Sequence, residues 1–494
     1  MRRREFLGQS MAAAAALASA RFAYAAPSTD IPAVSRTGKP MLLKAADLEM
    51  FRAGQRGPVL TRASEGYDTA RRVWNGAFDR HPALIARCTG ASDVAGAVQF
   101  AASQDLLVAV RGGGHSLPGY SCCEGGIMID LAPLDGVYVD PKTRRARVEP
   151  GTLLGALDRE TQAFGLVVPA GTVSHTGVAG LTLGGGVGRL MRKYGLTVDS
   201  LVSADIVTAD GKLLHASEEE NRDLFWALRG GGGNFGVVTS FEFQAHEFGT
   251  SAYGGEIVFP IEQARTVYDA FADYSERAPD ELAFGPVLEC DEAGHRQISL
   301  EVCHCGSDAQ AARDLAVIRK FGKPVRDSVA RKPWVVVQSE FDWQSPHGRG
   351  YYMSGGRVMS LAPALLDHVI ESIKLPGAKL GKISLGQHGG EAARRPVDST
   401  AYASRESSFN FVVRASWSDP SQARERTAWQ KETWARIQPF SVGLYANLNA
   451  AEAAVRARSA YGVNLERLIE VKTRYDPKNL FHLNPNITPR AAGA

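Results

Sequence analysis

The six residues RGGGHS, residues 111–116, place three consecutive glycines directly before one histidine. Three glycines leave no side chains there, so the backbone beside His115 can approach a bulky group closely. The N–H groups of such a turn could bind phosphate, and the imidazole could bind a metal ion or act as a base. No acidic residue or cysteine stands next to His115 at the spacing of a metal or catalytic site. The six residues alone leave these alternatives open.

The chain around these residues predicts an α+β domain with mixed sheets over residues 67–247. LVAVRGG (107–113) predicts a strand that ends at the glycines, and ASDVAGAVQFAASQD (91–105) predicts the helix before it. LVSADIVTADGKLLHAS (201–217) predicts a hairpin that turns at Asp210-Gly211.

The second half of the chain has longer strand and helix patterns than the first. Between residues 251 and 438, long strand patterns such as FNFVVRASW (409–417) alternate with long amphipathic helix patterns. This pattern predicts a second domain, built from an antiparallel sheet that is covered by helices. The tail 461–487 predicts a helix that ends near Asp476-Pro477 and an extended strip after it.

The N-terminus carries a targeting pattern. Arg3 and Arg4 form a twin-arginine pair, residues 11–20 are apolar and alanine-rich, and residues 23–25 read Ala-Tyr-Ala, a small-x-small cleavage site. A general secretory signal is the alternative. Residues 1–25 hold four of the 56 Lys and Arg and one of the 53 Asp and Glu, which leaves 52 of each sign. We therefore expect export to the periplasm or the medium, no nucleic-acid partner, and no membrane span after cleavage.

Three other motifs point to no site of their own. GGGNFG (231–236) fits the dinucleotide fingerprint G-x-G-x-x-G, but a helix precedes it and a strand follows, which is the reverse of the required order. Cys303-His304-Cys305 alternates like a strand and has no second ligand pair nearby, so no metal site is expected. There is no G-x-S-x-G, which disfavours a serine hydrolase. Six cysteines are too few for a disulfide scaffold and leave a single bridge open.

Four segments taken together resemble one family. They are RGGGHS, residues 169–211, residues 221–243 and residues 461–487. In this order they resemble the berberine bridge enzyme-like flavoprotein oxidases of the vanillyl-alcohol oxidase superfamily, and are similar to bacterial sugar-oligosaccharide oxidases and aclacinomycin oxidoreductase. The resemblance implies a two-part FAD-binding domain of the PCMH type, with mixed sheets and helices, and a substrate domain. The implied boundaries are a signal peptide at 1–25, the FAD-binding domain at 45–248, the substrate domain at 249–440, and a C-terminal segment at 441–494 that returns to the FAD-binding domain.

The resemblance also implies how FAD is held. The family's histidine that matches His115 is bonded to the 8α carbon of the flavin, and a neutral imidazole is a competent nucleophile for that bond. Many members add a cysteinyl bond in a run resembling GTCPTVG; here residues 171–177 read GTVSHTG, with Val173 at the matching place. A single covalent link, through His115, is therefore expected. The other matching cofactor positions are Arg111, Gly112, Gly113, Gly114, Ser116, Gly171, Thr172, His175, Thr176, Gly177, Gly180, Gly185, Asn234, Gly236, Val237, Asn447 and Asn484.

The implied reaction is hydride transfer from an alcohol, or from a C–H beside a heteroatom, of a sugar or secondary metabolite to FAD, with oxygen reduced to hydrogen peroxide. The matching general base is Tyr445, whose phenol pKa, about 10 in water, would have to fall. Tyr120, Gln387 and His388 are further candidates for contact with the substrate. Two alternatives stay open. Val178 and Ala179 could restrict oxygen, which would make the protein a dehydrogenase with another acceptor, or the protein could bind flavin without turnover. The sequence determines neither the exact substrate nor the oligomeric state.

Overall fold

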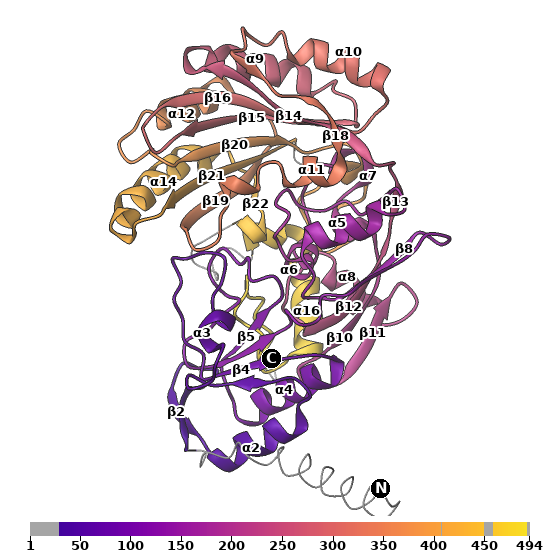
Figure 1. The fold of residues 1–494 in the computed structure, drawn as a ribbon, viewed down its shortest axis with the longest axis vertical. Helices are drawn as coiled ribbons and strands as arrows, with labels where there is room; N and C mark the ends of the chain where they lie inside the picture. The colour runs from indigo at the N-terminus through magenta and orange to yellow at the C-terminus, as the bar shows by residue number, and fades with distance from the viewer. Residues whose placement is uncertain (1–28, 407, 449–457, 492–494) are drawn as a thin grey trace, which may run out of the picture.

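The computed structural model describes residues 29–406, 408–448 and 458–491. A first part extends to β13 (His246–Glu247), and a second part lies above it in Figure 1. The C-terminal segment, yellow in Figure 1, returns from the second part to the first. Helices and sheets are mixed throughout, so the expected α+β class is confirmed. The predicted signal peptide lies outside the described residues.

The first part begins with a four-stranded sheet, three of whose strands are parallel. Apolar side chains one helical turn apart, such as Val94 and Val98, are fully buried beneath it, as an amphipathic helix requires. The sheet order is β3 (Val59–Leu60), β4 (Leu84–Arg87), β6 (Ile127–Asp130) and β5 (Val108–Arg111), and its helices are α2 (Ala45–Gly54), α3 (Tyr67–Ala70) and α4 (Ala91–Ser103). Because β5 ends at Arg111, the glycine loop and His115 leave from the carboxyl edge of this sheet.

A five-stranded antiparallel sheet completes the first part. The expected hairpin over residues 201–217 is confirmed, because its two strands pair antiparallel from Ser203 to Val207. The sheet order is β11 (Leu213–Ser217), β10 (Leu201–Val207), β12 (Val237–Gln244), β8 (Arg145–Val148) and β7 (Val137–Asp140). The helices of this region are α5 (Leu154–Gln162), α6 (Val178–Leu183), α7 (Met191–Tyr194) and α8 (Arg222–Leu228). Two small sheets pair β1 (Ile31–Val34) with β2 (Pro40–Leu43) and β9 (Leu166–Val167) with β13.

The second part is built on one antiparallel sheet, as expected. Its order is β17 (Arg326–Asp327), β14 (Ser251–Pro260), β16 (Arg296–His304), β15 (Leu282–Cys290), β20 (Lys382–Gln387), β21 (Phe409–Trp417), β19 (Gly350–Val358) and β22 (Gly443–Leu444), with β18 (Ala330–Pro333) paired to β14. The strand β22 lies just past the expected boundary at residue 440.

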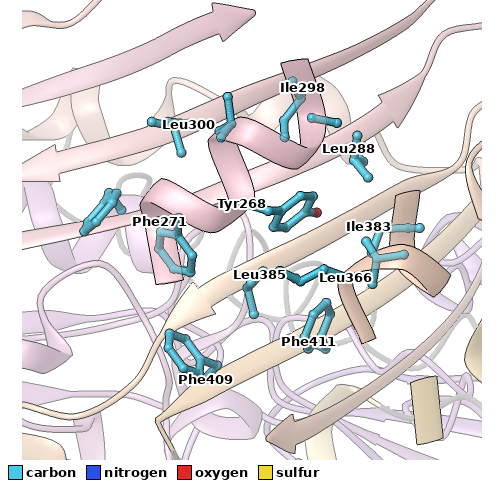
Figure 2. Packing of buried hydrophobic residues seen from close by; sticks show 14 of the residues in the cluster. Tyr268, Phe271, Leu288, Ile298, Leu300, Leu366, Ile383, Leu385, Phe409 and Phe411 are labelled. Carbon is cyan, nitrogen blue, oxygen red and sulfur yellow. The ribbon is translucent and has the colours of Figure 1, made fainter. Parts of the chain in front are cut away.

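Helices cover one face of this sheet. Figure 2 shows Tyr268 and Phe271 of the covering helix packed toward Ile383, Leu385 and Phe411 of the strands. Because side chains alternate along a strand, Lys382, Ser384 and Gly386 of β20 lie on the opposite face, which is turned to the first part. The helices of the second part are α9 (Ala264–Ser275), α10 (Asp308–Ile318), α11 (Trp334–Ser339), α12 (Pro363–Ser372), α13 (Glu391–Arg394) and α14 (Ala423–Ile437).

The C-terminal segment is fastened to the first part by a buried cluster. In α16 (Leu465–Tyr475), the ammonium group of Lys472 donates to the backbone oxygens of Asn234 at 2.7 Å and Phe481 at 2.9 Å, and to the carboxylate of Asp476 at 2.7 Å. The side chains of Lys472 and Asp476 are both fully buried. Within the described residues, no helix is both long and apolar enough to cross a bilayer. All six cysteines are free thiols.

Candidate functional site

A cavity of about 580 Å³ lies where the two parts meet. Its walls come from the loop after β5, residues 171–191, the loop before β12, the uncovered face of the second sheet, and the C-terminal segment. A volume of this size is typical of cofactor and small-molecule sites. The segments that carried the family resemblance therefore meet around one space.

The glycines that line the cavity are of two kinds, those packed against protein and those that face open space. A Cβ atom on Gly113 would lie 2.4 Å from the Cα of Gly177, and one on Gly112 would lie 2.9 Å from the Pro150 carbonyl oxygen. These two glycines are thus required by backbone packing against protein, whereas the sequence suggested approach to a ligand. Gly180 and Gly233 line the cavity, and a Cβ on either would meet no atom within 4 Å. The open backbone that could accommodate a ligand is therefore at these later glycines.

His115 is held at the cavity by its neighbours. Its ring stacks on the indole of Trp74, with ring centroids 4.1 Å apart, and its Nε2 is buried without a hydrogen-bond partner. Burial, together with the nearby rings of His175 and His347, lowers its pKa to about 3. The imidazole is therefore neutral at physiological pH, and an unshared nitrogen lone pair is available beside the cavity.

Tyr445 and Asn447 are brought together on the cavity wall by the C-terminal segment. The backbone N–H of Gly186 donates to the phenol oxygen at 3.2 Å, and the amide of Asn447 donates to it at 3.3 Å. Burial raises the pKa of Tyr445, although both hydrogen bonds favour the phenolate and oppose that rise. The protein alone therefore does not lower the pKa of Tyr445, as the role of general base would require.

These features fit the dinucleotide that the resemblance implies. An unpartnered Nε2 and two open glycine positions border one cavity, which is what a covalently held flavin with a diphosphate would require. The expected residues that line the cavity are Gly112, Gly113, Gly114, His115, Ser116, Tyr120, Gly171, Thr172, Thr176, Gly177, Gly180, Gly236, Val237, Gln387, Tyr445, Asn447 and Asn484.

Five expected residues do not line this cavity: Arg111, His175, Gly185, Asn234 and His388. The guanidinium of Arg111 donates to the Ala70 carbonyl, and His175 faces a separate, neighbouring cavity. A Cβ on Gly185 would clash with the ring of Tyr402, 2.3 Å away, so this glycine is required by packing.

Asn234 and His388 have structural surroundings instead. The Asn234 amide donates to the Gly231 carbonyl at 2.8 Å and its oxygen accepts from the Ile487 N–H at 3.0 Å, which ties the loop to the tail. His388 is buried, with its Nε2 3.4 Å from the Tyr402 hydroxyl. Gln387 borders the cavity, but its amide donates at 3.0 Å to the Ser275 carbonyl at the end of α9, on the helix-covered side.

Sequence reasoning missed several residues of the cavity. Trp74 carries no local signal, since it precedes the loop by 37 residues and reaches His115 only in the fold. Glu301, Lys382 and Arg414 line the side formed by the second part, and Arg189 of the first part lies beside Phe341 of the second. The alternation of apolar and polar residues in KISLGQ could have identified Lys382 as a residue of the uncovered face.

No metal centre is formed by the described residues. His304 of the Cys-His-Cys run pairs with Asp314 at 2.9 Å and is fully buried. Cys303 borders the cavity, and burial raises the pKa of its thiol to about 11. The structure thus agrees with interpreting this run as a strand.

Comparison with known proteins gives matches across the chain. Residues 82–217 match the family described as FAD binding domain, and residues 444–488 match the one described as Berberine and berberine like. An FAD-linked oxidoreductase of Dictyostelium discoideum is 31% identical over 88% of this chain and 95% of its own length. The (R)-6-hydroxynicotine oxidase of Paenarthrobacter nicotinovorans is 30% identical over 88% and 97%. A solved structure of glucooligosaccharide oxidase from Acremonium strictum, described as holding 6-S-cysteinyl, 8α-N1-histidyl FAD, superposes with a TM-score of 0.81 at 25% identity, covering 90% of this chain and all of that one.

Proposed function

The chain belongs to the berberine bridge enzyme-like family of FAD-linked oxidoreductases, and from that membership we propose that it oxidises an alcohol group of a sugar or secondary metabolite with FAD bonded to His115 alone. The observation that carries this proposal is the neutral, unpartnered Nε2 of His115 at the wall of the cavity. Tyr445 as the base, the open backbone at Gly180 and the polar wall around Lys382 border the same cavity.

The single covalent link is supported from both sides of the cavity. Val173 lines the wall at the position where doubly linked relatives have cysteine, and its side chain cannot form a thioether. Cys303 also borders the cavity, but burial raises its pKa to about 11, so it is a thiol at neutral pH and a poor nucleophile. His115 is the remaining nucleophile of the expected set.

In the proposed reaction, FAD held at His115 would supply the hydride acceptor, and oxygen would be the final electron acceptor, reduced to hydrogen peroxide. Tyr445 accepts the hydroxyl proton of the substrate. The Gly186 N–H and the Asn447 amide stabilise the phenolate through the hydrogen bonds that they donate to its oxygen. Asn447 also donates to the Gly180 carbonyl at 3.2 Å, which fixes the amide beside the open glycine.

The electron acceptor is a distinct question. Ala179 lines the cavity and Val178 is fully buried beside it, so a methyl group stands where a smaller residue would leave more room for oxygen. This observation favours a dehydrogenase with a dye-like acceptor as the second candidate. We also propose that the FAD-loaded protein is exported by the twin-arginine route, which the sequence of residues 1–25 alone supports.

The test is an anaerobic screen of sugars, alcohols and amines against the purified yellow protein, in which flavin absorbance is the readout. Bleaching by an alcohol supports the proposal. Bleaching by none of the panel supports a protein that binds flavin without turnover. Readmission of air then separates the two enzymes, because an oxidase releases peroxide, whereas a dehydrogenase is reoxidised only by an added dye.

A further inference from the structure

Three cations gather at one wall of the cavity, Lys382 and Arg414 from the second part and Arg189 from the first. Arg189, Lys382 and Arg414 border the space, and Glu301 is the one carboxylate among the described residues that do so. A low-dielectric space disfavours unpaired charges, so an excess of one sign calls for a partner.

One short segment of the chain holds all three cations. The guanidinium of Arg189 lies 5.2 Å from the ring centroid of Phe341. The ammonium group of Lys382 donates to the side-chain oxygen of Gln344, and Arg414 donates to the hydroxyl of Ser345 at 3.0 Å. Residues 341–345 thus fix the three side chains relative to one another at the cavity wall.

The charge of Lys382 is compensated within the protein. Its ammonium group lies 2.6 Å from the Glu301 carboxylate, and Glu289 stands directly opposite it on β15. Glu289 does not itself border the cavity; it accepts a hydrogen bond from Gln297 at 2.5 Å. Lys382 therefore needs no further anion.

The two arginines are compensated less closely, because Glu301 acts on both and Glu289 acts on Arg414 without a contact of ion-pair length. Among the described residues neither Arg189 nor Arg414 forms an ion pair, and the Nε of each is buried without a hydrogen-bond partner. Arg414 also stands directly opposite Lys382 in the pairing of β20 with β21, and like charges in that position destabilise a sheet. Burial lowers the pKa of Arg414, which shows the same unfavourable desolvation. A bound anion would offset each of these costs.

We propose that the substrate carries a carboxylate, which Arg189 and Arg414 bind at the cavity wall. The planar guanidinium fork matches a carboxylate geometrically. The charge of Glu301 already acts on both arginines and disfavours a doubly charged phosphate at the same place, so we commit to a singly charged acid. The substrate class is then a hydroxy acid or an acidic sugar. This inference rests on the proposed function, since it names the substrate of the same site.

The test measures binding, which needs no turnover. The flavin-loaded protein is titrated calorimetrically with two matched pairs of probes, D-glucuronate against D-glucose and mandelate against 1-phenylethane-1,2-diol. We expect at least one acid to bind about tenfold or more tightly than its neutral partner, because hydrogen bonds to charged groups are individually strong. The preference should weaken as NaCl is raised.

Variants assign the preference to residues. Arg414→Met or Arg189→Met should remove the preference for the acid, because each weakens binding of the acid more than binding of the neutral partner. Arg414→Lys, which keeps the charge, should retain part of it, and serves if the methionine variant fails to fold. Arg265→Met, on the exposed surface of α9, is the matched control and should bind as the parent does.

Equal affinity for both members of each pair, or binding of neither member, overturns the inference. It is also overturned if the arginine variants lose flavin or change its resting absorbance while the acid preference persists, because the arginines then serve the cofactor. The two proposals fail separately. Arginine-dependent acid binding without bleaching supports the carboxylate site and contradicts the proposed oxidation. Bleaching by neutral alcohols alone supports the proposed oxidation and contradicts the carboxylate site.

Discussion

The imidazole of His115 lies nearly parallel to the indole of Trp74, with ring centroids 4.1 Å apart and planes inclined by 14°. Trp74 stacks in turn on Tyr351 of β19, again at 4.1 Å, and its indole N–H donates to the Ser345 carbonyl at 2.8 Å. The histidine proposed to carry FAD is thus oriented by a stack that continues into the second part of the molecule. The segment that holds the cavity's cations also holds this stack.

Replacing Trp74 should loosen His115 without removing it. We expect Trp74→Leu to lower the fraction of flavin that resists acid extraction. It should also lower the free energy of unfolding, by no more than the loss of about 3–5 kcal/mol that is typical of deleting a buried aromatic ring. Trp74→Phe keeps a ring in the stack and should retain most of the linked flavin. An unchanged acid-resistant fraction in Trp74→Leu would show that the stack does not orient the imidazole.

His388 should make the fold sensitive to acid. Burial, with Arg357, Arg405 and Arg192 nearby, lowers its pKa to about 3 from the ordinary value of 6.5. Between these values the unfolded chain binds a proton that the folded chain does not. The free energy of unfolding should therefore fall as pH decreases below about 6.5, by up to about 1.4 kcal/mol per pH unit from this group.

His388→Asn tests that dependence. Urea denaturation at several pH values between 7 and 5 should give a shallower loss of stability in the variant than in the parent, whatever their difference at pH 7. His115 titrates in the same window in both proteins, so it cancels from the comparison. Parallel pH profiles would mean that His388 is not the buried neutral group that the structure shows.

Tyr445→Phe should slow the chemical step and leave the cofactor in place. Loss of a general base lowers rates by about 10²–10⁴-fold, and phenylalanine preserves the packing of the buried ring. Because burial raises the pKa of Tyr445, the parent's rate of anaerobic flavin reduction should still be rising in the alkaline range, and this limb should vanish in the variant. Tyr120→Phe is the control; if it abolishes reduction while Tyr445→Phe does not, the base has been misassigned.

Lys472 should be essential to the docking of the C-terminal segment. Lys472→Met leaves the fully buried carboxylate of Asp476 without its cation, which should cost about 3–5 kcal/mol in chemical denaturation. Combining it with Asp476→Asn should restore part of that loss, because the charge left behind is removed. The exposed pair Arg436 and Glu432 gives the control, for which Arg436→Met should cost about 1 kcal/mol or less. Equal effects at the two pairs would contradict the buried-charge account.

Local patterns were sufficient for much of the fold. The hairpin at 201–217 and the helix, glycines and strand around residues 221–244 could be predicted because periodicity and glycine positions are short-range signals. The glycines of RGGGHS indicated close approach but not its partner, which for Gly113 is Gly177. The pairing of Lys382 with Arg414 depends on sheet register, and Arg189 joins them from more than 190 residues away, so no local pattern could bring these side chains together.

Peptide mapping tests most directly whether FAD is bonded to His115 alone. The protein is precipitated in acid, digested with trypsin, and its flavin-bearing peptides are sequenced by mass spectrometry. Cleavage after arginine and lysine places His115 in the peptide 112–142, and both Val173 and His175 in the peptide 160–189. We predict a coloured pellet with all of its flavin on peptide 112–142. A colourless pellet with free FAD in the supernatant, or flavin on peptide 160–189, would contradict the account.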